Sequence, residues 1–130
     1  MATWRDYLRE ARRFWDVAEA TDDPEHANQA VSNAIHAAIA ANDAVCLYLG
    51  GERPSRESHA EAARVLRRVC KGTEHEKAAT AKAKQFTEVL QAKNAAQYEG
   101  RPMGKTKVVR IMKQARRFVE WAEEALPPVS

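Results

Sequence analysis

The chain of 130 residues is poor in the residues that interrupt or cross-link a fold, with only 5 Gly, 5 Pro and 2 Cys. Nowhere do β-branched residues alternate with polar ones over the length of a strand, which excludes a sheet protein. Cys46 and Cys70 lie inside expected helices, outside any CxxC or Cys/His spacing, so they predict buried thiols and argue against a zinc site. We therefore expect an all-α protein with no bound metal and no cofactor.

Two further absences concern location and partners. The sequence has no charged-then-apolar leader, and no unbroken apolar run approaches about 20 residues, which argues against secretion and a membrane span. We therefore expect a cytoplasmic protein. The net charge is only +3, from 21 basic and 18 acidic side chains, and does not by itself indicate a nucleic-acid binder. The length predicts a single domain, residues 1–130, around one core.

Helical periodicity and turn residues predict five helices, over about residues 4–20, 24–49, 56–71, 74–100 and 105–126. The second segment is apolar around nearly its whole circumference, which is typical of a buried central helix. Links of only a few residues favour antiparallel neighbours. The sequence thus predicts an up-and-down bundle of four to five helices.

One polar stripe interrupts the apolar second helix. Its members fall within roughly one quarter of the helical circumference at about 100° per residue, and they are Gln29, Ser32, Asn33, His36 and Asp43. Buried polar side chains need partners. His36 and Asp43 are therefore candidate binding residues.

Lys93 stands where the inward-facing pattern of the fourth helix would place an apolar residue. Phe86 and Leu90 occupy the preceding turns, and Asn94 and Tyr98 lie beside Lys93. One interpretation is that Lys93 extends past the core into water while Tyr98 packs its ring and exposes its hydroxyl. The other is a cationic pocket in which Asp43 or His36 is the counter-group, because an unpaired buried ammonium is costly.

These features make the chain resemble the HEPN family over nearly its whole length. The resemblance rests on the small helical bundle, on Asn-Asp-Ala-Val-Cys-Leu-Tyr (42–48) in an Ala-rich second helix, and on Lys-Asn-Ala-Ala-Gln-Tyr (93–98) ending the fourth. It implies a HEPN-like bundle, often a homodimer, that binds RNA or nucleotides. It also implies, for many members, a metal-independent ribonuclease of defence or toxin–antitoxin systems.

The motif of active family members is an arginine, usually followed by a polar residue, with a histidine several positions later. Lys93, Asn94 and Tyr98 occupy these positions and are the candidate catalytic residues. A phenol, with an ordinary pKa near 10, is a poorer general base at neutral pH than an imidazole near 6.5. Lysine holds a phosphate only as a point charge. We expect binding to survive better than cleavage, and enzymatic activity stays open.

Arg53 and His59 form a second candidate pair at an Arg-x5-His spacing. His59 is expected near a helix N-terminus, where an anion could bind. The alternative is that His59 begins the core-facing stripe of the third helix and is a partly buried packing residue.

The segment 101–117 carries seven basic side chains and no acid. Arg110 and Arg117 are the candidate phosphate contacts, and Trp121, one turn beyond Arg117, could stack on a base or anchor a dimer. The alternative is a solvated helix face. The apolar side chains of this fifth predicted helix are all expected to pack in the core, which argues against membrane binding.

The leading hypothesis is a homodimeric, HEPN-like protein that binds RNA or a nucleotide and cleaves RNA weakly, conditionally or not at all. Cleavage would yield a 2′,3′-cyclic phosphate. The alternative is a non-catalytic protein-interaction module, such as the helical partner of a toxin or a nucleotidyltransferase. In that case the polar stripe only fixes the register of the helices.

Overall fold

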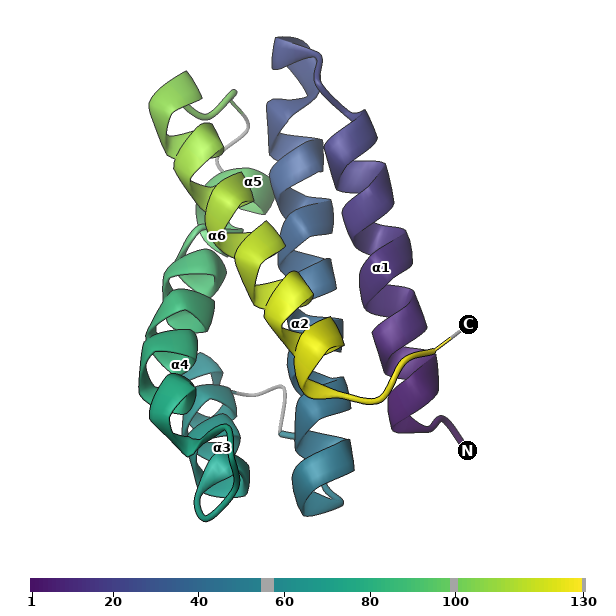
Figure 1. Ribbon diagram of the computed structural model, residues 1–130. Helices are drawn as coiled ribbons and strands as arrows, with labels where there is room; N and C mark the ends of the chain where they lie inside the picture. The colour runs from purple at the N-terminus through teal and green to yellow at the C-terminus, as the bar shows by residue number, and fades with distance from the viewer. Residues whose placement is uncertain (55–57, 99–100, 130) are drawn as a thin grey trace.

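The computed structural model is a helical bundle, and it has no strand among the residues it describes. These are 1–54, 58–98 and 101–129, without the side chains of Gln97 and Tyr98. The helices are α1 (Trp4–Ala20), the short 3-10 helix η1 (Pro24–His26), α2 (Ala27–Gly50), α3 (His59–Cys70), α4 (Glu76–Gln91), α5 (Lys93–Tyr98) and α6 (Lys105–Ala125) (Figure 1). The predicted all-α bundle is confirmed.

α2 is the central helix, as its composition predicted. It lies between α1 on one side and α3, α5 and α6 on the others (Figure 1). Thirteen of its 24 residues are buried, and nine of the 13 are alanine or valine, whose small side chains let the neighbouring helices pack closely. The segment Pro24–Gly50 is long and apolar enough to cross a membrane by length and composition, but 72% of its apolar window is covered inside the bundle.

The link between α2 and α3 reverses the path of the chain. Gly51 ends α2 in the left-handed region (φ 72°), which glycine adopts without steric cost. The chain then folds back along α2, so that Ser58 lines the same pocket as Asn42 while Val69 lies against Gly50. α3 therefore runs parallel to the C-terminal half of α2, and α4 returns antiparallel to α3 (Figure 1).

The prediction of one long fourth helix continuing to about residue 100 is wrong in one respect. α4 ends at Gln91, Ala92 forms a turn, and a separate six-residue helix, α5, begins at Lys93. The third helix was also predicted to begin too early. It starts at His59 with Ser58 as its N-cap, the Ser58 hydroxyl accepting a hydrogen bond from the Glu61 amide (3.2 Å). The predicted start at Arg56 lies outside the described residues.

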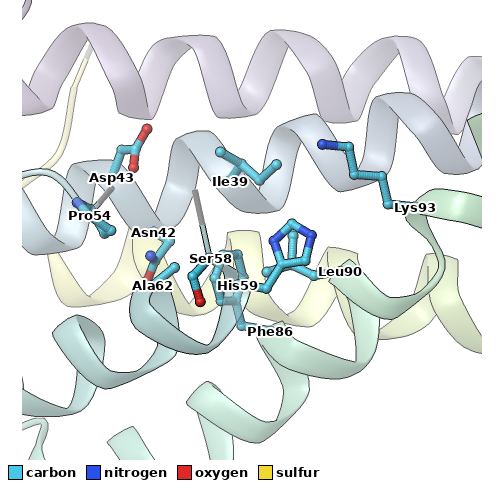
Figure 2. A pocket seen from close by; sticks show the side chains of 10 residues that line it. All are labelled: Ile39, Asn42, Asp43, Pro54, Ser58, His59, Ala62, Phe86, Leu90 and Lys93. Carbon is cyan, nitrogen blue, oxygen red and sulfur yellow. The ribbon is translucent and has the colours of Figure 1, made fainter. Parts of the chain in front are cut away.

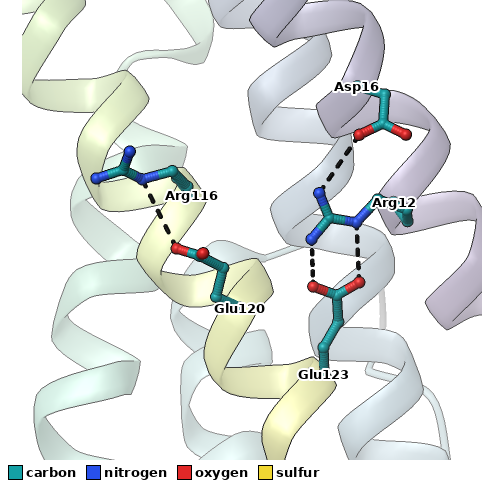
Figure 3. A network of polar contacts seen from close by, with 5 residues as sticks. All are labelled: Arg12, Asp16, Arg116, Glu120 and Glu123. Carbon is teal, nitrogen blue, oxygen red and sulfur yellow. Dashed lines mark hydrogen bonds and ion pairs between the residues drawn. The ribbon is translucent and has the colours of Figure 1, made fainter. Parts of the chain in front are cut away.

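Two polar clamps fix the position of α6. Near its C-terminus, the Arg12 guanidinium of α1 donates from Nε to Glu123 (2.9 Å), makes a second hydrogen bond to the same carboxylate, and donates to Asp16 (3.3 Å) (Figure 3). The hydrogen bonds to Glu123 raise the pKa of Arg12 above its ordinary value. Before its N-terminus, the Asn28 side chain donates to the Arg101 carbonyl (2.8 Å) and accepts from the Met103 amide (2.9 Å).

Candidate functional site

Lys93, His59 and Asp43 line one pocket, although they come from three separate parts of the chain. α2 supplies Asp43, the start of α3 supplies His59, and the start of α5 supplies Lys93 (Figure 2). The apolar part of the wall is formed mainly by Ile39 of α2 and by Phe86 and Leu90 of α4. The pocket thus combines a cation, an imidazole and a carboxylate with an apolar floor.

Lys93 brings a positive charge to the pocket. No acidic side chain among the described residues forms an ion pair with it. Its side chain is half-buried, and Figure 2 shows its amine directed from α5 across α2, on the same side as the His59 ring. Among the residues the structure describes, Lys93 makes no ion pair. Removing a charge from water is costly without a counter-ion, so an anion entering this pocket would be attracted to the Lys93 amine.

Asp43 is paired with Arg53 rather than with Lys93. The Asp43 side chain is 5% exposed, and its Oδ2 accepts from Arg53 Nη2 at 3.3 Å. The Arg53 guanidinium also lies over the ring of Tyr7, 4.6 Å from its centroid. Arg53 therefore links α1, α2 and the returning loop, and it compensates a carboxylate whose burial alone would be unfavourable.

Asn42 and Ser58 also line the pocket, and the sequence reasoning did not single them out. Asn42 is 1% exposed, and its Oδ1 is 3.9 Å from the Cys46 thiol, which donates to it. Ser58 caps α3 at the pocket wall. The local signal for Asn42 is its position beside Asp43 in an otherwise apolar stretch. Ser58 could have been identified only if the start of α3 had been predicted correctly.

The prediction that His59 begins a core-facing stripe is wrong. His59 is exposed and is the first residue of α3. His59 lies on the same side of α3 as Ala63, but the buried residues of the helix begin only one turn later, at Ala63. His59 is thereby placed at the rim of the pocket, close to the positive end of the α3 dipole.

Three other candidates lie away from this pocket or cannot be placed. His36 is half-buried, with its ring against Phe14 of α1 (centroids 5.3 Å apart), and it does not line the pocket. Asn94 is exposed on α5 and does not line it either. The side chain of Tyr98, the last residue of α5, lies outside the described part of the chain.

The basic face of α6 begins beside the junction of α4 and α5. Arg110 and Lys107 line a polar groove that reaches Ala92, the residue before Lys93. Arg117 is exposed two turns further along α6 and lies near Lys82, where burial and the charge of Arg117 lower the pKa of the Lys82 amine.

Trp121 is not a free aromatic anchor. It is half-buried, and its ring packs edge-on against His75 (6.3 Å) and obliquely against Phe118 (5.8 Å). The intramolecular contact with His75 leaves Trp121 poorly placed for base stacking or for anchoring a dimer.

The two cysteines are buried free thiols, as predicted, and burial raises the pKa of both. In the described ranges, no group of three or more His, Cys, Asp or Glu side chains is arranged to hold a metal ion.

Comparison with models of known protein families shows to which family this chain belongs. A comparison with curated protein sequences gave no match. The model of the HEPN domain family matches residues 4–125, which includes every helix described above and the whole pocket. This chain therefore belongs to the HEPN domain family, a membership that indicates a function related to nucleotides or RNA.

Proposed function

We propose that this protein binds RNA or a nucleotide through the pocket lined by Lys93, His59 and Asp43. The observation that carries the proposal is the half-buried amine of Lys93, which lines the pocket and makes no ion pair within the described residues. The family resemblance places Lys93 at the position of the motif arginine. A phosphate is the anion that this site suits best, because Lys93 and the start of α3 present positive charge from two sides.

The acidic residue of the pocket does not oppose such a ligand. The Asp43 carboxylate is neutralised by Arg53 at 3.3 Å and lies at the end of the pocket away from Lys93 (Figure 2). The wall formed by Ile39, Phe86 and Leu90 would contact a ribose or the face of a base, as apolar pocket walls commonly do in ligand sites.

RNA is favoured over a single nucleotide by the groove beside α6. Arg110 and Lys107 line this groove together with Glu88, whose carboxylate accepts a hydrogen bond from the Gln114 side chain (3.0 Å), and neither cation forms an ion pair within the described residues. Two such cations beside the pocket suit further phosphates of one strand. Lys93 would hold one phosphate while the α6 face holds the next ones.

The finer proposal is a weak or conditional metal-independent ribonuclease of a defence or toxin–antitoxin system, in which His59 replaces the imidazole that the motif lacks. His59 comes from α3 but lines the same pocket as Lys93. The His59 imidazole would take the proton of a ribose 2′-hydroxyl, and the 2′-oxygen would attack the phosphorus held by Lys93. The 5′-oxygen would leave with a proton from Tyr98 or water, giving a 2′,3′-cyclic phosphate.

Binding is tested with a labelled single-stranded RNA and the Lys93→Ala variant, with Lys84→Ala as the matched control. Lys84 is an exposed lysine of α4 that does not line the pocket, so both variants lose one positive charge. We expect Lys93→Ala alone to weaken binding and to lower the log–log salt slope by about 0.7, the value for one single-strand phosphate contact. Equal effects of the two variants would contradict the proposed site.

Cleavage is tested separately by incubating the RNA with the protein in EDTA and identifying the 3′ ends. We expect slow formation of cyclic phosphate that is lost in His59→Ala and reduced in Tyr98→Phe. Activity retained in His59→Ala would remove His59 from the chemistry, whereas binding without any cleavage would leave only the binding function.

A further inference from the structure

Arg53 lies beside the end of the pocket that is away from Lys93, and its guanidinium is held by two contacts. Arg53 Nη2 donates to the buried carboxylate of Asp43 at 3.3 Å, and Cζ lies 4.6 Å from the centroid of the Tyr7 ring. Asp43 and Pro54, the residue after Arg53, both line the pocket and lie together in Figure 2. Arg53 therefore stands at the edge of the pocket, with its planar group fixed against α1.

These two contacts leave part of the Arg53 side chain open to solvent. The side chain is 37% exposed, although that of its partner Asp43 is only 5% exposed. Pairing a carboxylate requires only a positive charge, whereas a guanidinium adds a weakly hydrated plane that stacks on aromatic rings. One face of this plane lies on Tyr7. A flat group of a ligand would meet the opposite face.

The two ends of the pocket therefore offer different chemistry. At one end, Lys93 makes no ion pair within the described residues and attracts an anion. At the other end, the charge of Arg53 is compensated by Asp43, which leaves little net attraction for a second phosphate. The apolar side chain of Ile39 lies between them (Figure 2). An anion at one end and a flat, uncharged ring at the other is the pattern of a nucleotide, in which a ribose joins a phosphate to a base.

We infer that Arg53, supported by Tyr7, forms a base-stacking subsite for the nucleotide whose phosphate is held by Lys93. The inference rests on the proposed function and deepens it, because it names the substrate class as RNA with unpaired bases. Unpaired bases can turn outward and stack on aromatic side chains or on the plane of an arginine, whereas the bases of a duplex are stacked on one another. Arg53 would contact the base, and Tyr7, behind it, is a positioning residue.

The contribution of the base is measured by comparing a short oligouridylate with a strand of the same length and charge that lacks its bases. Arg53→Lys keeps a charge to pair with Asp43 but removes the plane. It should weaken binding of the oligouridylate roughly 2- to 30-fold, the range for one cation–π contact, and leave binding of the base-free strand unchanged. The log–log salt slope should stay at the wild-type value, because no phosphate contact is lost.

Arg64→Lys is the matched control for this substitution. Arg64 is an exposed arginine of α3 that pairs with Glu61 at 2.7 Å and does not line the pocket. Tyr7 supplies a second, independent variant. Tyr7→Leu should weaken binding of the oligouridylate but not of the base-free strand, and Tyr7→Phe, which keeps the ring, should bind like the wild type. A thermal melt of each variant checks that the fold persists.

Two kinds of result would contradict the inference, and they are distinguishable. Equal losses for both strands, or no loss in either Arg53→Lys or Tyr7→Leu, would overturn the stacking subsite, while a weakened Lys93→Ala variant would leave the phosphate site standing. A wild type that binds neither strand would contradict the proposed function, and the stacking subsite with it.

Discussion

Replacing Gly50 with alanine should destabilise the fold, because the added methyl group would meet α3. A β-carbon on Gly50 would lie 2.3 Å from Cγ1 and 3.1 Å from Cβ of Val69, whereas favourable carbon–carbon contacts are about 3.5–4.0 Å. Val69 is nearly buried, and a branched side chain in a helix has one strongly preferred rotamer. Overpacking of this kind costs about 1–3 kcal/mol, against a gain of at most about 1 kcal/mol in helix propensity. We expect a net loss of roughly 0.5–2 kcal/mol in the free energy of unfolding.

A double-mutant cycle measured by urea unfolding separates the two contributions. In a Val69→Ala background the Cγ1 methyl group is absent and only the β-carbon contact at 3.1 Å remains, so Gly50→Ala should cost clearly less than in the wild type. The loss of stability caused by Gly50→Ala should therefore shrink between the two backgrounds. A Gly50→Ala variant as stable as the wild type would refute the close parallel packing of α3 on α2, and with it the placement of His59 beside Asn42.

Three further predictions concern the clamps and the thiols. Arg12→Ala should cost about 0.5–1 kcal/mol in thermal unfolding, because the pair with Glu123 is partly exposed and screened; a stability change near zero would count against the α1–α6 clamp. Asn28→Ala should cost about 1–2 kcal/mol by leaving two backbone groups without partners, and Asn28→Asp should cost less because it keeps the acceptor for Met103; equal losses would argue against that hydrogen bond. The folded-state pKa of Cys46 is raised above its ordinary value of 9.0, so the thiolate favours the unfolded chain and stability should fall as the pH rises above about 9. Cys46→Ala should flatten this alkaline loss, which would be unchanged if Cys46 were not its source.

The parts of the fold that depend on local chemistry could be predicted from the sequence. Thr3 and Asp6 form the capping box that their spacing indicated, with the Thr3 amide donating to Asp6 at 2.8 Å. α1 ends at Ala20, as its periodicity indicated, and the all-round apolar character of α2 correctly placed it at the centre. These features follow from side chains within a few residues of one another.

The break between α4 and α5 could not be predicted in the same way. Alanine has the highest helix propensity of the amino acids, yet Ala92 forms the turn that ends α4. Nothing within a few residues marks this position, and Ala92 is buried at 1% exposure, so packing against the rest of the bundle overrides its local preference.

The sequence indicated some residues of the candidate pocket but not their arrangement. Lys93 and Asp43 were identified because each interrupts an apolar pattern, which is a local signal. That Arg53 pairs with Asp43, and that His59 lines the same pocket as Lys93, depends on the path of the chain that folds back along α2. Such a path is set by tertiary contacts, which a periodicity in one segment does not encode.

The most direct test of the pocket is an amide NMR titration of the protein with a short single-stranded RNA. We predict that the largest chemical-shift changes fall on Asn42, His59 and Lys93, with smaller changes along α6 near Arg110. Changes confined to the α6 face, or no changes at low salt, would contradict the assignment of this pocket as the ligand site.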